Sequence, residues 1–267
     1  MPEEPPENIS SGVDESATAV FEAGTTGTRA EAVVDELGGL YWQKTYGGKD
    51  AFESLVRTIL SQNTSDVASQ PAHDALMKRY GGDGDLAAAL AGAEQSELAE
   101  TISSAGLYNQ KSEMIVGAAE RICEEYGGAD GFDAFVREDA PSEVRQRLLD
   151  IHGVGPKTAD CVLLFAGGRD GVFPVDTHVH RIARRMGLAP ADADHETVRE
   201  HLEAEVPAEK CGFGHTAMIQ FGREYCTARS PACLDGPEAC PLYDLCDRVG
   251  VDEVEETVVD PSDVAGD

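Results

Sequence analysis

The sequence predicts an all-α protein, and two observations lead to that prediction. Apolar residues recur at a spacing of three to four along most of the central chain, which is the period of a helix with one buried face. No segment alternates apolar and polar residues for long enough to predict a sheet, and the chain contains no internal repeat. We therefore expect helices throughout the region between an N-terminal arm and a C-terminal tail.

Five segments carry such an apolar face, and glycine or proline marks where several of them begin or end. Pro141 favours a helix start because its fixed φ suits the first turn. Gly167 and Gly168 end another segment, and Gly106 interrupts a third. The segments expected to be helical are 51–60, 102–122, 142–149, 159–165 and 196–205.

The charge balance is extreme, with 21 basic residues against 50 acidic ones and a formal net charge of -29. Such a surface should repel nucleic acid, and an acidic surface of this kind is typical of a halophile, which we expect here. Residues 1–35 hold eight acidic residues and one basic one, and residues 251–267 hold seven acidic residues and no basic one. These two segments carry -14 of the charge, so the central body carries about half of it.

The two ends of the chain differ from the body in composition. Residues 1–28 are rich in Pro, Glu, Ser, Thr and Gly and are expected to form a disordered acidic arm, and residues 249–267 a similar acidic tail. The chain has neither an apolar stretch of membrane-spanning length nor the basic start of a secretory signal. We expect a cytoplasmic protein with no membrane partner.

Four of the seven cysteines crowd into residues 226–246, in the pattern C-x6-C-x6-C-x5-C. Four thiolates in one short loop suit an iron–sulfur cluster, whereas structural zinc usually has pairs of the form C-x2-4-C, of which there are none. Zinc is the alternative. The predicted ligands are Cys226, Cys233, Cys240 and Cys246, and Cys123, Cys161 and Cys211 are expected to be buried, inert thiols.

Gly153, Val154 and Gly155 separate the helix expected at 142–149 from the next one. Glycines allow a tight turn, and the amides of such a turn and of the following helix N-terminus can bind a phosphate without any side-chain charge. The alternative is a plain corner between two helices. Some twenty residues later, Asp176 precedes Thr-His and three arginines at 181, 184 and 185. Taken alone, Asp176 is best explained as the N-cap of the helix that carries the arginines, and a solvated helix face is an alternative explanation for the three arginines.

Taken together, these segments resemble the endonuclease III family of iron–sulfur DNA glycosylases, from about residue 48 to residue 248. The resemblance includes Leu60-Ser-Gln-Asn-Thr-Ser-Asp, Gly106-Leu-Tyr-Asn-Gln-Lys, Gly153-Val-Gly-Pro-Lys-Thr-Ala, Val175-Asp-Thr-His, Val206-Pro-Ala-Glu and the cysteine loop. It implies a bifunctional glycosylase and AP lyase that removes damaged bases, mainly oxidised pyrimidines, from double-stranded DNA. It also implies a 4Fe-4S cluster and a monomer associated with the nucleoid.

The resemblance also assigns roles to particular residues. Lys157 corresponds to the nucleophile and Asp176 to the catalytic carboxylate. The polar residue that enters the gap left by a flipped base falls on Gln62 or Asn63, and the apolar wedge falls on Leu107. Gly153, Val154 and Gly155 form the DNA-binding hairpin, and the four cysteines of the loop bind the cluster.

The implied architecture has two helical domains with a DNA-binding cleft between them. A six-helix domain at 48–168 carries the hairpin, and residues 29–47, with a helix near 29–46, join 169–248 to form the cluster domain. Three features depart from the family. His152 replaces a hairpin proline, six residues separate the second and third cysteines instead of the usual two, and the acidic arm and tail have no counterpart.

Two alternative functions are a monofunctional mismatch glycosylase and a non-catalytic iron–sulfur module that binds DNA. The adenine-removing relatives lack the lysine and carry a glutamate near the position of Arg57 and Thr58, where this chain has no carboxylate. They also have a further C-terminal domain, for which the 21 residues after Cys246 leave no room. The presence of both Lys157 and Asp176 favours the enzyme over the non-catalytic module.

Overall fold

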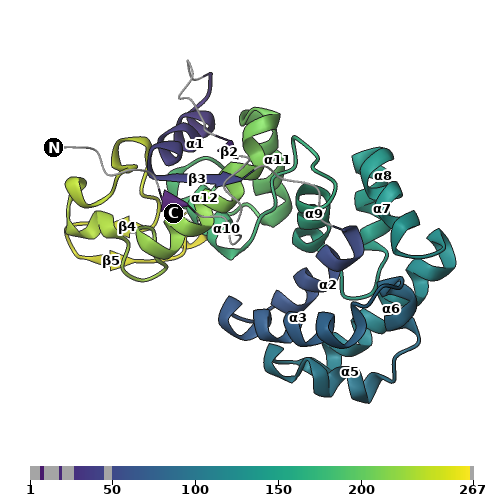
Figure 1. The fold of residues 1–267 in the computed structure, drawn as a ribbon. Coiled ribbons are helices and arrows are strands. Elements are labelled where there is room, and N and C mark those ends of the chain that lie inside the picture. The colour runs from purple at the N-terminus through teal and green to yellow at the C-terminus, as the bar shows by residue number, and fades with distance from the viewer. Residues whose placement is uncertain (1–6, 9–17, 20–26, 45–49, 265–267) are drawn as a thin grey trace. The chain divides into compact units, whose positions relative to one another are not determined.

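The computed structural model describes residues 7–8, 18–19, 27–44 and 50–264 (Figure 1). The prediction of an all-α fold is confirmed, since the strands of the described residues are only two to four residues long. The chain divides into two compact units. We call residues 46–169 the continuous unit, and residues 1–45 together with 170–267 the split unit.

The continuous unit contains eight α-helices in its described part, rather than the six expected, because two short helices lie where the sequence shows little periodicity. Its helices are α2 (Ala51–Ser61), α3 (Asp66–Tyr80), α4 (Leu86–Ala91), α5 (Gln95–Thr101), α6 (Tyr108–Tyr126), α7 (Ala129–Glu138), α8 (Pro141–Leu149) and α9 (Pro156–Phe165), with a 3-10 turn, η1, at Ser103–Ala105. The expected segments 51–60, 142–149 and 159–165 correspond to α2, α8 and α9. The expected break at Gly106 separates η1 from α6.

Helix α2 forms the centre of this unit. Asp50 caps its start by accepting a hydrogen bond from the amide of Glu53 at 2.7 Å. Its apolar face is fully buried against α3, α6, α7 and α9. The residues of that face are Phe52, Leu55, Val56, Ile59 and Leu60. Helix α2 ends at Ser61, and a turn at residues 62–65 follows it.

The split unit is built from four longer helices around one apolar core. They are α1 (Arg29–Leu40), α10 (Thr177–Met186), α11 (His195–Glu205) and α12 (Cys211–Glu224), with η2 (Ala208–Lys210) before α12. The core is formed by residues such as Val34, Phe173 and Phe221. Lys210 ties η2 to α1 because its buried ammonium donates to Glu31 at 2.8 Å and to Asp35 at 2.6 Å. The loop 226–246 follows α12 and contains three short 3-10 turns, η3 (Ala232–Asp235), η4 (Pro237–Ala239) and η5 (Tyr243–Leu245).

The N-terminal segment differs from its prediction. The helix expected near 29–46 ends at Leu40, and the chain continues as β3 (Tyr41–Lys44). β3 pairs in parallel with β1 (Glu7–Asn8) and antiparallel with β2 (Thr18–Ala19). Two short pieces of the expected arm therefore have regular structure, and the rest of that arm lies outside the described residues.

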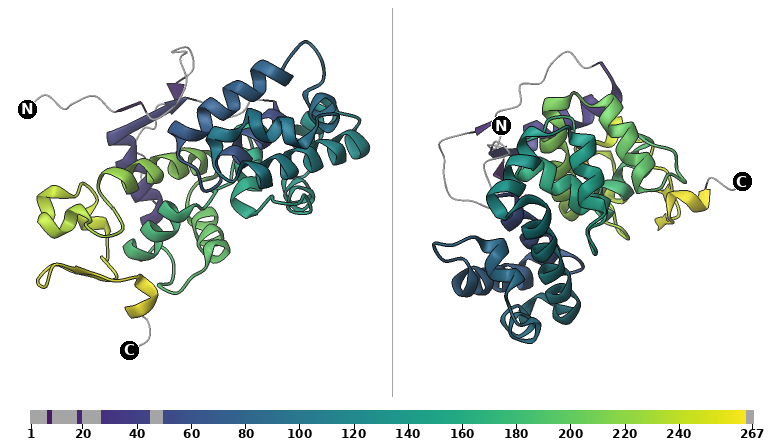
Figure 2. Two further views of the ribbon diagram at one scale, coloured as in Figure 1. Left: turned by 90° about the horizontal axis from the view of Figure 1, so that it is seen from below. Right: turned by 90° about the vertical axis from the view of Figure 1, so that its right-hand side faces the viewer.

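The acidic tail was expected to be unstructured like the arm, and for residues 249–264 this is wrong. β4 (Val251–Asp252) and β5 (Thr257–Val258) form a small antiparallel hairpin, which α13 (Pro261–Val264) follows. Glu253 accepts a hydrogen bond from the Tyr243 hydroxyl at 2.8 Å and forms an ion pair with Arg248, whose Nε lies 2.9 Å from its Oε1, so the hairpin lies beside the cysteine loop (Figure 2). Two acidic side chains of the tail, Glu253 and Asp260, thus have specific partners elsewhere in the split unit.

Asp260 forms the second attachment of the tail. Both of its oxygens accept from the guanidinium of Arg184, at 2.9 and 3.0 Å, and Arg184 lies buried on α10. This hydrogen-bonded ion pair holds the pKa of the Asp260 carboxyl well below its usual range.

We predict that Asp260→Asn lowers the free energy of unfolding by about 1–3 kcal/mol at neutral pH, because it leaves a buried guanidinium without its anion. A depressed folded-state pKa stabilises the protein above the ordinary carboxyl pKa, about 3.9, and the contribution is lost as the pH falls toward the lowered value. The difference between wild type and variant should therefore be constant near neutrality and shrink below about pH 4. Chemical denaturation across this range measures it. A difference that grows in acid would contradict the ion pair.

Candidate functional site

The hairpin between α8 and α9 uses its two glycines in different ways. Gly153 has φ +82°, a left-handed backbone angle that favours glycine, and a Cβ there would also lie 2.5 Å from the sulfur of the flexible Met114 side chain. Gly155 has φ −94°, which any residue can adopt, and a Cβ there would meet nothing within 4 Å. Of the two glycines that allow the tight turn, only Gly153 uses a backbone angle that favours glycine. What Gly155 provides is open space beside the N-terminus of α9.

The first turn of α9 presents unused amides to that space. Among the hydrogen bonds of the described residues, none uses the backbone N–H of Gly155, Lys157 or Thr158 as a donor. Pro156, at the first helical position, has no N–H to satisfy. Unpaired amides at the positive end of a helix bind anions such as phosphate. The buried ion pair of Arg145 on α8 with Asp160 on α9, at 2.7 Å, holds the two helices of the hairpin together.

Lys157 differs from the other lysines of the described residues. Lys111 and Lys210 are buried and fully engaged, and Lys78 is exposed on α3. Lys157 is half-buried at the second position of α9, and its amine has neither a hydrogen-bond acceptor nor a carboxylate partner in the part of the chain that the structure describes. A sheltered amine without a partner is available for chemistry.

Gln62 and Asn63 lie in the turn after α2, but their surroundings differ. The side-chain amide of Gln62 donates to the carbonyl of Gly153 at 3.0 Å and to the Thr158 hydroxyl at 3.1 Å, so it braces the hairpin. Asn63 is exposed, with φ +50°. Leu107, at the start of α6, also has φ +50° and is 55% exposed. An exposed leucine with a left-handed backbone is unusual, and strain of this kind is often found at binding sites.

Asp176 is the N-cap of α10, as its isolated sequence context indicates. Its Oδ1 accepts from the amides of His178 at 2.9 Å and Val179 at 2.8 Å. Its Oδ2 has no hydrogen-bond donor among the described residues, and the side chain is half-buried. The cap therefore uses one oxygen of the carboxylate and leaves the other available. Asp176 belongs to the split unit and Lys157 to the continuous unit.

The three arginines of α10 do not form the solvated face that was the alternative expectation. Arg181 donates to the carbonyls of Gly222 and Cys226, at 3.1 and 2.8 Å. Arg185 is 2% exposed and donates to the carbonyl of Thr227 at 2.8 Å and to Cys226 Sγ at 3.4 Å. With Arg184 bound to the tail, all three attach other segments to α10. Sequence reasoning missed this role because arginine spacing alone does not reveal burial.

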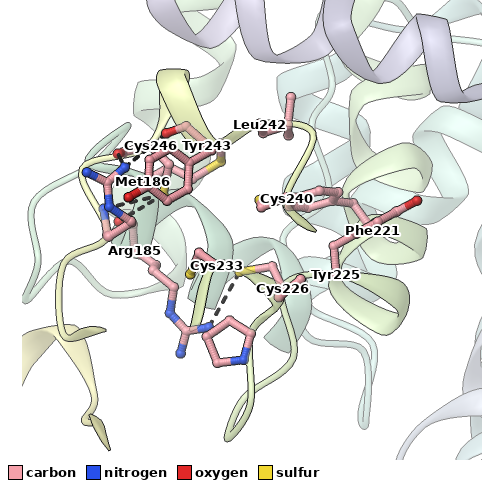
Figure 3. A pocket seen from close by; sticks show the side chains of 13 residues that line it. Arg185, Met186, Phe221, Tyr225, Cys226, Cys233, Cys240, Leu242, Tyr243 and Cys246 are labelled. Carbon is pink, nitrogen blue, oxygen red and sulfur yellow. Dashed lines mark hydrogen bonds between the residues drawn. The ribbon is translucent and has the colours of Figure 1, made fainter. Parts of the chain in front are cut away.

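The four cysteines of the loop line one pocket together with Phe221, Tyr225 and Leu242 (Figure 3). In the part of the chain that the structure describes, no three Cys, His, Asp or Glu side chains converge on a point that could hold a single metal ion. Four cysteines around one pocket are the donor set that an iron–sulfur cluster takes.

The other three cysteines lie away from this pocket. Cys161 and Cys211 are buried as expected, and Cys123 is half-buried. Burial raises the pKa of the Cys211 thiol to about 12 and also raises the pKa of Cys123. None of the three lines the pocket that the loop cysteines share, and that they are inert stays a prediction.

Comparison with known proteins identifies the family. Residues 56–208 match the HhH-GPD superfamily of base excision DNA repair proteins, and residues 226–246, from the first to the last loop cysteine, match the iron–sulfur binding domain of endonuclease III. None of the helices in the described residues is long and apolar enough to cross a membrane.

Individual relatives agree with these matches. The chain is 33% identical to endonuclease III of Thermotoga maritima over 198 residues, which cover 74% of this chain and 83% of the relative. It is 33% identical to endonuclease III of Bacillus subtilis over 195 residues, covering 73% and 80%. A solved structure of a trapped endonuclease III–DNA covalent intermediate is 30% identical, with a TM-score of 0.63 over 76% of this chain and 86% of that one. The chain belongs to the endonuclease III family of base excision DNA repair proteins.

Proposed function

We propose that this protein is a bifunctional DNA glycosylase and AP lyase that removes damaged bases, mainly oxidised pyrimidines, and then cleaves the abasic strand. The observation that carries the proposal is the half-buried amine of Lys157, which has no partner in the described residues and lies beside the free amides of α9. In a chain with six lysines, a sheltered lysine without an ion pair is better explained as a nucleophile than as a structural cation.

Lys157 supplies the electron pair for the reaction. The deprotonated amine attacks C1′ of the damaged nucleotide, the N-glycosidic bond breaks, and the base leaves with its electron pair and takes up a proton. Ring opening converts the product into a protonated Schiff base on the lysine. Loss of a proton from C2′ then expels the 3′ phosphate, which breaks the strand. The free oxygen of Asp176 stabilises the positive charge that develops on the sugar.

The hairpin and the two exposed turns bind the DNA. The backbone N–H groups of Gly155, Lys157 and Thr158 donate hydrogen bonds to a phosphate of the DNA, so this contact needs no cationic side chain. Leu107 enters the stack as an apolar wedge. Of the two candidate amides, Asn63 is free to fill the gap left by the flipped base, whereas Gln62 is occupied in bracing the hairpin. Filling the gap offsets the few kcal/mol needed to flip a base.

The cysteine loop holds the 4Fe-4S cluster through Cys226, Cys233, Cys240 and Cys246, and the cluster fixes the fold of the loop. Arg185 places a positive charge next to Cys226 Sγ, which suits a negatively charged thiolate ligand. In the reaction of Lys157 described above, the bonds that form and break are those of the lysine amine and of the DNA.

We predict that the purified protein is brown and contains about four iron atoms per chain, from the four-thiolate binding mode. Cys240→Ser should bleach the protein and lower its iron content, because it removes one ligand. Cys123→Ser and Cys161→Ser serve as controls and should keep both colour and iron. Metal analysis of anaerobically purified protein provides the measurement, and stoichiometric zinc without iron would refute the cluster.

A second prediction concerns Lys157. Borohydride should trap a covalent adduct between the protein and DNA that contains an abasic site, and peptide mapping should place the adduct on Lys157. Lys157→Ala and Lys157→Arg should both abolish the adduct, because alanine has no amine and the guanidinium of arginine stays protonated. If Lys157→Arg keeps its lyase activity, the lysine acts as a phosphate ligand and not as the nucleophile.

Asp176→Asn provides the matched test of the carboxylate. Asparagine is as good an N-cap as aspartate, so α10 and the fold should be preserved. The variant loses the negative charge, and base release should slow by about 100-fold or more in single-turnover assays. Asp176→Ala removes the cap as well and should, in addition, lower stability by about 1 kcal/mol. A normal rate of base release in Asp176→Asn would show that the charge is not needed.

A further inference from the structure

Lys111 is a buried lysine with no carboxylate among its hydrogen-bond acceptors. It lies in the first turns of α6, and its side chain is 2% exposed. Its ammonium donates to the carbonyl of Leu60 at 2.7 Å, to the hydroxyl of Thr64 at 2.6 Å and to the carbonyl of Ala105 at 2.7 Å. An ammonium has three N–H donors, so all of them are used. Burial lowers the pKa of Lys111, which shows that the site disfavours the charge that it holds.

The three acceptors lie in or next to two turns that are separate in the sequence. Leu60 and Thr64 flank the turn after α2 that carries Asn63, and Ala105 ends η1, just before Leu107. The Thr64 hydroxyl also lies 2.6 Å from the carbonyl of Ala105 and can donate its own proton to it. One ammonium and one hydroxyl thus join two turns that are more than forty residues apart in the sequence.

Each turn displays one side chain from a left-handed backbone. Asn63 and Leu107 both have φ +50°, and they are the two non-glycine residues with positive φ in the described part of the continuous unit. A left-handed conformation is tolerated by asparagine but is strained for leucine, so Leu107 keeps it only when its surroundings hold the backbone in place. The bonds of Lys111 and Thr64 hold the chain at Leu60 and Thr64, on either side of Asn63, and at Ala105, two residues before Leu107.

We propose that Lys111 is a positioning residue that locks the turns of Asn63 and Leu107 together, so that both side chains enter the DNA stack as one preformed unit. The proposal rests on the function proposed above. If the turns were independent, each would have to be ordered separately on the DNA, and the loss of conformational freedom would oppose base flipping. A prearranged pair avoids that loss.

If Lys111 has this role, its loss should affect cleavage of duplex DNA and of single-stranded DNA differently. In a duplex, the target nucleotide must leave the stack, and its place must be filled. In a single strand there is no stack to open, so the chemistry of Lys157 proceeds without the two side chains. Lys111 should therefore matter for duplex DNA and not for single-stranded DNA, whereas a lysine needed only for folding would affect both equally.

The test compares Lys111→Met with wild type at abasic sites in duplex and in single-stranded DNA, by single-turnover strand cleavage. We expect the duplex rate to fall roughly 10- to 100-fold, the loss that a misplacement of about 1 Å can produce. The single-strand rate should stay close to wild type. Fluorescence of 2-aminopurine placed opposite the abasic site should also rise less, because the wedge enters less often. Lys78→Met, which removes an exposed lysine of the same unit, should behave like wild type in both assays.

A double-variant comparison shows whether Lys111 acts through the wedge. If it does, Lys111→Met combined with Leu107→Ala should be no slower on duplex DNA than the slower single variant. Multiplying effects, or equal losses on duplex and single strands together with a lowered melting temperature, would overturn the proposal. If Lys111→Met does not fold, Thr64→Val cuts the link to Ala105, keeps the lysine and should show the same difference between substrates. Failure of wild type to form a borohydride adduct would instead refute the proposed function and leave the geometry of Lys111 unaffected.

Discussion

The scarcity of cationic side chains is the constraint on which the rest of this structure depends. A chain with a net charge of -29 and six lysines cannot bind DNA through a broad basic surface. Four lysines have side chains that the structure describes, and these have distinct uses. Lys210 pairs with two acids, Lys111 joins two turns, Lys157 is left free, and Lys78 is exposed. In the function proposed here, phosphate binding is therefore assigned to backbone amides at the start of α9, and insertion into the stack to a leucine and an asparagine.

The three arginines of α10 are also engaged within the protein, because they attach other segments to this helix. Arg181 and Arg185 attach the start of the cysteine loop, and Arg184 attaches the acidic tail through Asp260. The acidity of the tail, which looks like a source of repulsion, is partly neutralised inside the split unit. In the described part of the cysteine loop, Arg229 is exposed and has no partner, so it is the loop arginine that remains available to a phosphate.

Sequence reasoning succeeded where the signal is local. The apolar faces of α2, α8, α9 and α11 lie within a residue or a few of their predicted positions, because burial of one helix face produces a regular pattern. It did not identify α3 or α12. Helix α3 buries mostly small residues and contains Pro71, and α12 contains Gly212, Gly214 and Gly222, which weaken a helical pattern. Gly222 is explained by tertiary packing, since a Cβ there would lie 2.8 Å from Nδ1 of His178.

In the candidate site, too, some features follow from local sequence and others only from the three-dimensional structure. The cysteine spacing and the Gly153–Gly155 turn are visible in the sequence, whereas the choice between Gln62 and Asn63 depends on which amide reaches the hairpin in three dimensions. The order of the tail and the three bonds of Lys111 also depend on contacts between residues far apart in the chain. No pattern of nearby residues encodes such contacts, so the sequence alone could not predict them.

The dependence of DNA affinity on salt tests the account most directly. Each cationic phosphate contact contributes about -0.9 to the slope of log affinity against log salt, because binding releases condensed counterions. If amides and uncharged wedge residues provide most of the binding, affinity for a duplex containing a stable abasic-site analogue should fall only shallowly as salt rises. A slope of about -6 or steeper would show that a set of basic side chains carries the binding, and would contradict the account.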